Sequence, residues 1–299
     1  MKKILLTIDV EDWFNVYLLS VKKWFKELPF KSQNEKYRFW ESRNVTVREI
    51  IVKILNLLDY FDIKATFFIL GWIAEKNPNI VLEIYNRGHE IASHGYSHEL
   101  VYWMNEEQFY EDTLRSKQIL ESIIKEDVIG YRASTASITK HALEMLKRMG
   151  FIYDASYYPT IYHDVYSSLD NIEKLDSVFL LERPCKIAEK FYEVPFSSLK
   201  IFKLFIPWSG GGYFRIIPLR IFNFGVKKIL KSQDVFVFYI HPWEFYHPYD
   251  IKEMKKIVKF RRKWGVNKTW SKFEKFLAYW RKRADFLTIR RYINEYLDI

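Results

Sequence analysis

The sequence predicts an α/β protein built from repeated βα units around a parallel sheet that curls into a barrel. Short runs of β-branched and aromatic residues alternate with longer stretches of helical period, which is the pattern of such units. The length of 299 residues with 49% hydrophobic content is sufficient for one large core. The chain contains seven candidate strands, one fewer than a complete eight-stranded barrel.

The candidate strands are short and apolar, and most of them end in a polar or charged residue. In a parallel barrel the carboxyl ends of all strands lie on one face, where such folds place their chemistry. The side chains at these ends are therefore the first candidates for a site. The predicted strands are 4–9, 64–70, 90–94, 129–134, 151–156, 191–197 and 235–241.

Helical stretches fall between these strands. The apolar spacing predicts helices over 45–61, over 105–125 with Asn105 as the N-cap, over 139–149 ended by Gly150, and over 215–231. The insertion 17–43 is long for a βα loop, and long loops at that face of a barrel usually shape substrate binding.

The remainder of the chain predicts a separate C-terminal element. Beyond Pro248 the sequence is helical until a short apolar piece at 286–289. We therefore expect a barrel over 1–248 and a basic, aromatic-rich helical extension over 249–299 that packs on it.

The net charge of +10 is concentrated in this extension. Between Lys252 and Arg291 there are 15 Lys or Arg and three acidic residues, with Trp and Phe interleaved. The segment could contact an anionic membrane or a lipid-linked glycan. We favour the alternative, in which an aromatic stripe packs on the barrel and the lysines face solvent. Nucleic-acid binding is not expected, because no recognised motif accompanies the charge.

Cysteine usage and the termini bear on location. The only cysteine is Cys185, so neither an intramolecular disulfide nor a thiolate metal cluster is possible. The apolar run before Asp9 is too short for a secretory signal, and no segment approaches a membrane span. We expect a cytoplasmic protein, which could associate with the periphery of the inner membrane.

Two histidines and three carboxylates point to chemistry. His94 and His98 directly follow a predicted strand, and Asp9, Glu11 and Asp12 end the first one. Two neutral imidazoles and one carboxylate leave a divalent transition metal with open positions for water and substrate. The pattern predicts a metal-dependent hydrolase.

Further polar residues end other predicted strands. Arg132, Asp154 and His241 occupy such positions and would converge on the same face. Taken singly, an Asp at a strand end is more often a turn or helix cap, and His241 could be a satisfied core histidine. The joint pattern favours a site.

With these residues the sequence resembles the polysaccharide deacetylases, the NodB-like carbohydrate esterases. Similar motifs are Asp-Val-Glu-Asp from Asp9, Ser-His-x-x-x-His from Ser93, Gly-Tyr-Arg from Gly130 and Ile-His-Pro from Ile240. The similarity extends to a subgroup found in bacterial exopolysaccharide loci, which has a C-terminal helical extension. Its further motifs correspond here to His163 with Asp164 and Tyr166, to Glu193 with Pro195, to 210–215 and to 241–244.

The resemblance implies a distorted (β/α)7 barrel that removes N-acetyl or O-acetyl groups from sugars. It implies that Asp9 is the general base and that His94, His98 and one acidic residue bind Zn²⁺ or a similar divalent ion. It also implies that His241 protonates the leaving amine. Arg132 would hold Asp9 ionised, and Asp154 or Asp164 would orient His241. A backbone N–H near Tyr131, or on the loop after the first strand, would donate to the oxyanion.

The sequence departs from the family at the first motif. The usual pattern has two adjacent aspartates, whereas Val10 follows Asp9 here, so Glu11 or Asp12 would be the ligand. Strand alternation places Glu11 on the same side as Asp9 and favours it slightly. We also expect the glycines of 210–212 to bring backbone close to the substrate or the metal loop. Candidate sugar contacts are Trp13, Tyr131, His163, Trp208, Tyr213 and Trp243.

The leading prediction is a metal-dependent deacetylase acting on an acetylated glycan: an exopolysaccharide, peptidoglycan or a lipid-linked precursor. One alternative is a cyclic-amide hydrolase related to allantoinase, and another is a non-catalytic glycan-binding barrel. Metal content together with acetate release separates the three. The sequence does not predict an oligomeric state.

Overall fold

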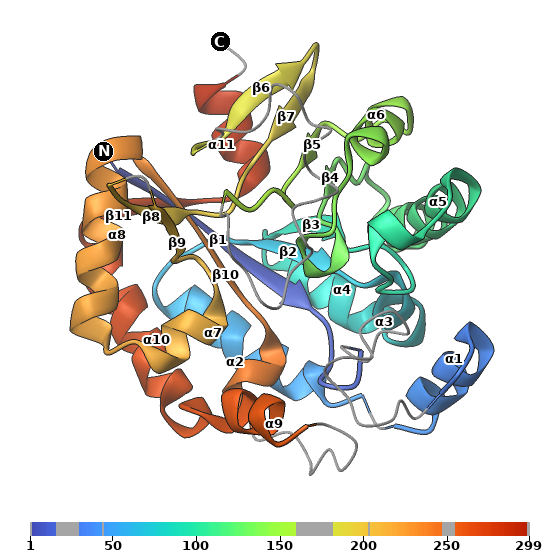
Figure 1. Cartoon of the computed structure of the whole chain (residues 1–299), viewed down its shortest axis with the longest axis horizontal. Coiled ribbons are helices and arrows are strands. Elements are labelled where there is room, and N and C mark those ends of the chain that lie inside the picture. The colour runs from blue at the N-terminus through green and yellow to red at the C-terminus, as the bar shows by residue number, and fades with distance from the viewer. Residues whose placement is uncertain are drawn as a thin grey trace.

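The computed structural model describes residues 2–15, 30–43, 45–159, 182–202, 204–246 and 255–297. A curled sheet stands at the centre, and helices surround it (Figure 1). In the sheet, the strands follow the order β10-β1-β2-β3-β4-β5-β7-β6, and β11 pairs with β1. All neighbouring pairs are parallel except β6 with β7.

The seven predicted strands are present and form the parallel part of the sheet. They are β1 (Lys2–Val10), β2 (Thr66–Ile69), β3 (Glu90–Ser93), β4 (Gly130–Tyr131), β5 (Tyr153–Asp154), β7 (Phe191–Glu193) and β10 (Val235–Ile240). Apart from β1, which is longer than predicted, the regular strands are shorter than the predicted runs, because the polar residues at their ends leave the ladder and turn toward the carboxyl face. The (β/α)7 prediction is confirmed.

The strand β1 is the centre of the sheet. One of its edges pairs with β10 from Lys3 to Ile8. The other edge is shared, because β11 (Ala284–Leu287) pairs with its first half and β2 pairs with its second half. Seven consecutive residues of β1 are buried, as expected for a parallel strand covered on both faces.

The barrel is distorted between β7 and β10, where backbone pairing is replaced by side-chain and bridging contacts. The Ser197 hydroxyl accepts a hydrogen bond from the Val237 N–H at 2.9 Å. The Tyr239 N–H donates to the Ser209 carbonyl at 2.9 Å, within an isolated bridge between Gly210 and Tyr239. The segment after β9 therefore fills the gap.

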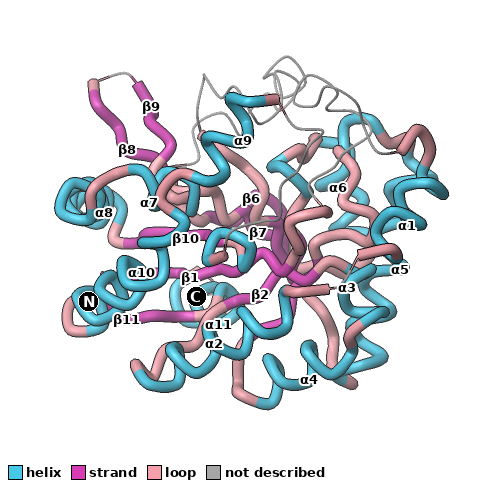
Figure 2. The backbone as a smooth tube through the Cα atoms, turned by 90° about the horizontal axis from the view of Figure 1, so that it is seen from below, coloured by secondary structure: helices cyan, strands magenta, loops and turns pink. Residues whose placement is uncertain are grey.

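The helices cover the outside of the sheet (Figure 2). Those predicted over 45–61, 105–125 and 139–149 are α2 (Val47–Tyr60), α5 (Glu106–Ile124) and α6 (Lys140–Arg148), and Asn105 caps α5 in a capping box. The structure adds α1 (Gln33–Glu41) in the predicted insertion, and α3 (Gly71–Lys76) and α4 (Pro78–Asn86) between β2 and β3.

The single helix expected over 215–231 is two helices, α7 (Gly211–Ile216) and α8 (Leu219–Gln233). Pro218 stands between them with ψ 137° and cannot donate a backbone hydrogen bond to a continuous helix. The prediction of one helix was wrong for this reason.

Several strands were not predicted. A hairpin of β8 (Ser198–Ile201) and β9 (Leu204–Pro207) stands apart from the main sheet, and β6 (Cys185–Ala188) pairs antiparallel with β7. The residues of these strands are partly exposed rather than buried throughout, and those of β6 and β8 mix apolar with charged or polar types, unlike the central strands.

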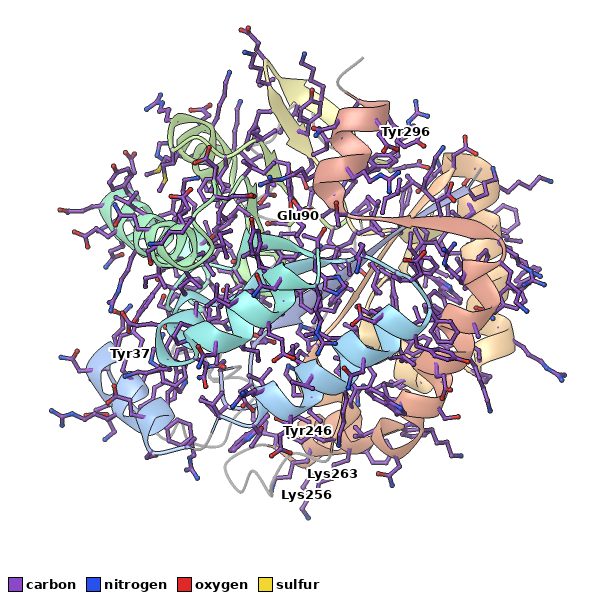
Figure 3. The ribbon with its side chains drawn as sticks, turned by 180° about the vertical axis from the view of Figure 1, so that it is seen from behind. Tyr37, Glu90, Tyr246, Lys256, Lys263 and Tyr296 are labelled. Atoms are coloured by element: carbon purple, nitrogen blue, oxygen red, sulfur yellow. The ribbon has the colours of Figure 1, made fainter. Side chains whose placement is uncertain are left out.

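The C-terminal segment contributes to the sheet itself. It forms α9 (Lys256–Lys263), α10 (Val266–Arg281), β11 and α11 (Ile289–Tyr296). The Ile289 and Arg290 N–H groups at the start of α11 donate to the Thr66 hydroxyl at 2.9 Å and to the Glu90 carboxylate at 3.0 Å. Figure 3 shows Glu90 beside the beginning of α11. The expected division at residue 248 stays a prediction.

The aromatic side chains of α10 behave as the favoured interpretation of the extension expects. Phe273, Phe276 and Trp280 are buried in the main core, and Phe276 contacts the rings of Phe214 and Phe238. In the described part of the chain, no helix combines the length and the apolar character needed to cross a bilayer.

Candidate metal centre and catalytic site

The end of β1 places three carboxylates in two different environments. Asp9 and Glu11 are on the barrel side and are 3% and 2% exposed. Asp12 turns the other way and caps α2: its carboxylate accepts hydrogen bonds from the Thr46 and Val47 N–H groups, at 2.6 and 3.1 Å, and from the Tyr246 hydroxyl at 2.6 Å. Because its oxygens are used in this way, Asp12 is not placed to be a ligand, and that alternative is corrected in favour of Glu11.

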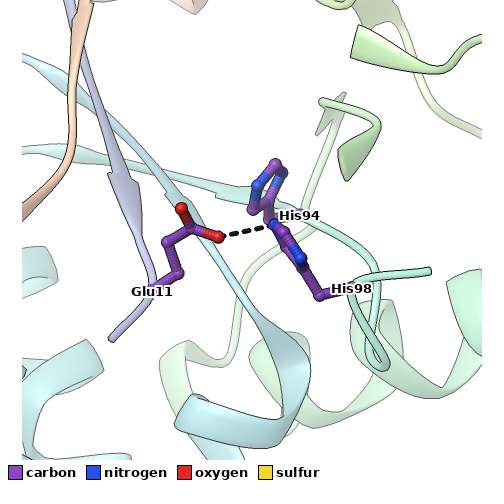
Figure 4. Close-up of side chains that lie close together, drawn as sticks. All are labelled: Glu11, His94 and His98. Carbon is purple, nitrogen blue, oxygen red and sulfur yellow. Dashed lines mark ion pairs between the residues drawn. The ribbon is translucent and has the colours of Figure 1, made fainter. Parts of the chain in front are cut away.

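Glu11, His94 and His98 form one buried group (Figure 4). One ligand atom from each lies within 4.8 Å of the others. His98 Nε2 and Glu11 Oε2 are 2.5 Å apart, yet Glu11 Oε2 has no hydrogen-bond partner of acceptable geometry, and neither has His98 Nδ1. Unsatisfied buried polar atoms are costly, and a shared cation would satisfy the carboxylate.

The protonation states of this group suit a cation. Burial lowers the pKa of His94 to about 4, so its imidazole is neutral near pH 7. Its Nδ1 lies 2.8 Å from the Arg132 carbonyl and donates its hydrogen to it. This fixes the tautomer and leaves the lone pair of Nε2 to bind a metal ion. Burial alone would raise the pKa of Glu11, but the imidazoles of His98, His241 and His94 outweigh it and hold that pKa well below its usual range.

The loop that carries His98 is held from two sides. The Tyr96 and Ser97 N–H groups donate to the Asp112 carboxylate of α5 at 2.8 and 2.9 Å. Lys36 of α1, which is fully buried, donates to the Ser97 carbonyl at 3.0 Å and pairs with Glu99. The predicted insertion therefore supports the His98 loop.

His98 itself is in the left-handed region, with φ 55°. A residue other than glycine in this region costs of order 1 kcal/mol and persists only where its surroundings impose it. The contacts of the loop with Asp112 and Lys36 supply that constraint.

Arg132 holds Asp9. Its Nη1 donates to Asp9 Oδ1 at 2.6 Å and to the Thr7 hydroxyl at 2.8 Å, and its Nε donates to the Ala155 carbonyl at 2.9 Å. The guanidinium is 1% exposed and lies over the Phe68 ring at 4.0 Å. Arg132 therefore contacts Asp9 as the resemblance implied, and the second oxygen of Asp9 faces His241.

His241 faces the same space from the end of β10. Its Nε2 lies 3.4 Å from Glu11 Oε1 and 3.9 Å from Asp9 Oδ2. Its Nδ1 lies 2.7 Å from Glu244 Oε1, and Arg215 Nε donates to the other oxygen of Glu244 at 2.8 Å. Burial opposes the charge on His241, but Glu244, Glu11 and Asp9 raise its pKa above the usual 6.5.

Nδ1 of His241 thus contacts Glu244 rather than Asp154, and a catalytic role for Asp154 stays a prediction. Asp154 accepts hydrogen bonds from the Ser156 hydroxyl and N–H at 2.7 and 3.0 Å. It also lies beside Glu193, and burial together with the charge of Asp154 raises the pKa of Glu193 well above its ordinary value. The other candidate, Asp164, lies outside the described residues.

Glu244 and Arg215 were missed as functional residues, although the sequence contained a signal. Glu244 follows His241 by three residues, which places both on one turn. A buried carboxylate needs a cation, and the motif at 210–215 ends in Arg215.

The first two glycines of that motif leave space for the side chains of Glu244 and Tyr239. A Cβ on Gly211 would lie 2.1 Å from Glu244 Oε1, and a Cβ on Gly210 would lie 2.6 Å from the Tyr239 hydroxyl. The close backbone approach that we expected exists, but its partners are these two side chains rather than the His94–His98 loop.

Comparisons of this sequence with known protein families agree with this geometry. Residues 43–153 match the family model described as polysaccharide deacetylase, and residues 155–294 match a domain of unknown function, DUF3473. This chain carries a polysaccharide deacetylase domain. The domain supplies β2 to β4 with both histidines, whereas β1 lies before it and β10 lies in the second match.

Curated relatives of the domain include peptidoglycan deacetylases. A peptidoglycan-N-acetylglucosamine deacetylase of Bacillus cereus is 43% identical over 75 residues, which are 25% of this chain and 27% of that protein. A peptidoglycan deacetylase of Helicobacter pylori is 30% identical over 116 residues, which are 38% and 40% of the two chains. The matches thus span less than half of these relatives.

Solved structures share the fold over nearly the whole length of this chain. A polysaccharide deacetylase structure from Mycobacterium smegmatis, described as putative, has a TM-score of 0.65 at 16% identity and covers 98% of this chain and 88% of that one. A Pseudomonas aeruginosa structure described as a probable polysaccharide deacetylase has a TM-score of 0.59 at 13% identity, covering 98% and 91%. The Puue allantoinase, covering the same shares, reaches 0.57 at 14% identity, so at this distance the similarity shows the barrel alone.

The expected sugar contacts of the deacetylase domain have mixed outcomes. Trp243 stacks on His241 with centroids 4.9 Å apart, and its indole donates to Glu11 Oε1 at 3.1 Å. Tyr131 packs between Phe109 and Phe151 in the core, so the prediction that its side chain binds sugar was wrong.

The other candidates lie in three kinds of place. Trp208 stacks on Phe222 in the core and does not line the site. Trp13 is 6% exposed beside Phe14, Tyr213 is partly exposed on α7, and for both a sugar contact stays a prediction. His163 lies outside the described residues.

The backbone N–H groups expected to bind the oxyanion on the loop after β1 already donate hydrogen bonds within the protein. On the loop after β1, the Glu11 N–H donates to the Asp9 carbonyl at 3.0 Å, and the Asp12 N–H donates to Asn15 at 2.7 Å. The Trp13 N–H donates to Asp12 at 2.8 Å, so these three groups are already used. An oxyanion donor near Tyr131 stays a prediction.

Proposed function

We propose that the protein is a metal-dependent hydrolase that removes acetyl groups from N-acetylated or O-acetylated sugars of a polysaccharide or glycan precursor. The observation that carries the proposal is the arrangement around Glu11, His94 and His98. Nε2 of His241 lies 3.4 Å from a Glu11 oxygen and 3.9 Å from an Asp9 oxygen, so His241 and Asp9 stand beside this group. A base, an acid and a cation site thus share one buried space.

The donor set fits a divalent ion such as Zn²⁺. Two imidazoles and one carboxylate are the ligands of catalytic zinc sites, which keep a position open. When bound, such an ion supplies Lewis acidity to the acetyl carbonyl and acidity to the attacking water.

The side chains of this chain then account for the protons. Asp9, whose first oxygen accepts a hydrogen bond from Arg132, takes the proton of the attacking water through its second oxygen. The new C–O bond forms, the C–N bond of the acetamide breaks, and Nε2 of His241 gives its proton to the leaving amine. Glu244 keeps His241 cationic for this step.

Neither alternative has a specific observation in its favour. The allantoinase similarity is limited to the barrel. A glycan-binding barrel without catalysis would not require a buried base held by Arg132 or an acid held by Glu244. The finer part of the proposal, an exopolysaccharide substrate, rests on the sequence motifs.

The test is acetate release from N-acetylglucosamine oligomers and from acetylated exopolysaccharide. The Asp9→Asn variant should lose about 10²- to 10⁴-fold in kcat, because the base is removed, while it keeps its metal. Folding is checked by circular dichroism. An Asp9→Asn protein as active as the parent, or a metal-loaded parent that releases no acetate from any acetylated sugar, would contradict the proposal.

A further inference from the structure

The exposed apolar side chains of the protein are unevenly distributed. Of the twelve large apolar residues that the structure describes as exposed, eight lie between residues 201 and 264. They come from the β8–β9 hairpin, α7, α8 and the end of α9. We call this surface the apolar-basic face; its apolar members are Ile201, Phe202, Leu204, Ile216, Ile221, Phe224, Phe260 and Trp264.

The tip of the β8–β9 hairpin is the most prominent part of this face. Phe202 is 95% exposed and Leu204 is 58% exposed. Phe202 also has φ 54°, a conformation that glycine or asparagine adopts at much lower cost. Because this ring is almost fully in water, it adds little to the core of the protein, which points to an external partner. Figure 2 shows the hairpin projecting from the body of the molecule.

The helix α9 emerges on the same side as the hairpin in Figure 2. Phe260 and Trp264, which are 55% and 50% exposed, make an edge contact with centroids 4.7 Å apart. Lys256 and Lys263 are exposed on this helix, and Figure 3 shows both at the edge of the molecule. The packing predicted for the aromatic residues of the extension therefore holds for α10 but not for the end of α9.

A basic cavity lies between α10, the end of α9 and the junction of α7 and α8. Its volume is about 680 Å³, and none of the described residues that line it is acidic. Lys272 is tied to the carbonyls of Phe214 and Ile217, where it closes the end of α7. Lys263, Lys268 and Lys275 are exposed around the opening. The cavity can take an anionic group beside the apolar side chains.

Charge and shape select the occupant. A second copy of the chain would bring the same positive charge against this surface, since 252–291 has 15 basic and three acidic residues. A soluble polyanion would use the lysines but would leave Phe202 and Trp264 in water. An anionic phospholipid bilayer satisfies both, because phosphates meet lysines while apolar rings enter the acyl boundary.

We propose that the apolar-basic face docks the protein on an anionic phospholipid bilayer, with the hairpin tip and α9 inserted and the lysines of the cavity on lipid phosphates. The docking requires no hydrolysis, so its test is independent of the proposed function.

The experiment is co-sedimentation of the full chain with phosphatidylglycerol-containing vesicles and with pure phosphatidylcholine vesicles. The parent protein should bind the anionic vesicles and not the neutral ones. The Phe202→Ser variant should bind about tenfold more weakly or worse, because it removes the inserted ring. Tyr60→Ser is the matched control, since Tyr60 is 79% exposed on α2 outside this face, and it should bind as the parent does.

A second pair of variants tests the charges. Lys263→Glu with Lys268→Glu should abolish the preference for anionic vesicles, whereas Lys53→Glu with Lys147→Glu, exposed on α2 and α6, should have a much smaller effect. The proposal is overturned if the parent does not bind anionic vesicles. It is also overturned if Phe202→Ser binds anionic vesicles as the parent does, since the lysines would then serve a soluble polyanion. It is overturned as well if each control variant binds as weakly as the variant that it is paired with.

Discussion

Asp9 and Glu11 occupy alternate positions at the end of β1, and their carboxylates have different partners. Asp9 is bound by Arg132 at one oxygen, and Glu11 is bound by Trp243 and contacts His98. The intervening Val10 is part of the core. Strand alternation therefore places both carboxylates on the barrel side, and this is why the sequence could favour Glu11 over Asp12.

Other site residues could not be assigned from the sequence, for a physical reason. The orienting role of Glu244 depends on a short turn after β10 and on the space left by Gly211, neither of which a strand pattern reveals. Asp154 has the same place at a strand end as His241, but its partner is the neighbouring Glu193. Position on the face was predictable, and so was the pairing of Arg132 with Asp9, whereas the partners of His241 and Asp154 were not.

The pairing of His241 with Glu244 predicts a change in pH dependence. Glu244→Gln removes an anionic partner, so the pKa of His241 falls and the cationic acid is lost at lower pH. The alkaline limb of kcat should move to lower pH, with a loss of about tenfold or more near neutrality. The measurement is the kcat profile of acetate release for both proteins.

Asp154→Asn is the comparison that separates the two assignments. It removes the orienting residue that the sequence suggested, and it should leave the alkaline limb in place. If the limb moved in Asp154→Asn and stayed in Glu244→Gln, the assignment of Glu244 would be wrong.

The register of β2 and β3 depends on a neutral histidine. At the start of β3, Nδ1 of His89 accepts a hydrogen bond from the Ala65 N–H at 3.2 Å, and its ring packs on Phe67 with centroids 5.1 Å apart. Burial lowers the pKa of His89 to about 4. Protonation would remove the acceptor and place a charge between two strands.

This histidine predicts a loss of stability in mild acid. Between pH 6.5 and 4 the unfolded chain binds a proton that the folded protein does not, so the free energy of unfolding falls as pH falls. The contribution is complete above pH 6.5 and declines by up to about 3 kcal/mol toward pH 4. Urea unfolding at several pH values measures it.

The His89→Gln variant should have a flatter dependence of unfolding free energy on pH across this window. His141→Gln is the matched control, because His141 is exposed on α6 and pairs only with the exposed Glu106. A slope unchanged by His89→Gln, or changed equally by the control, would remove this histidine from the account.

At the scale of the whole molecule, the seven parallel strands were predictable from the sequence, whereas the pairing of β11 with β1 was not. The seven strands were found because each is a continuous buried run. The strand β11 was missed because it is four residues long and follows a long helix, although its pairing with β1 brings residue 284 beside residue 2. Such distant pairing leaves no local signal.

The C-terminal segment therefore serves two parts of the molecule. Through β11 and α11 it covers the amino end of the barrel, where Glu90 accepts the Arg290 N–H. Through α10 it supports α7, and Arg215 of α7 holds Glu244. The match of residues 155–294 to a single family model is consistent with this integration.

The claim on which the catalytic account depends is that Glu11, His94 and His98 hold one divalent ion. Elemental analysis of the purified protein after dialysis measures it directly. We expect about one ion per chain in the parent and in Asp12→Asn, and almost none in Glu11→Gln or His94→Ala, each folded by circular dichroism. Equal metal content in Glu11→Gln and the parent, or loss of the ion in Asp12→Asn alone, would contradict the assignment.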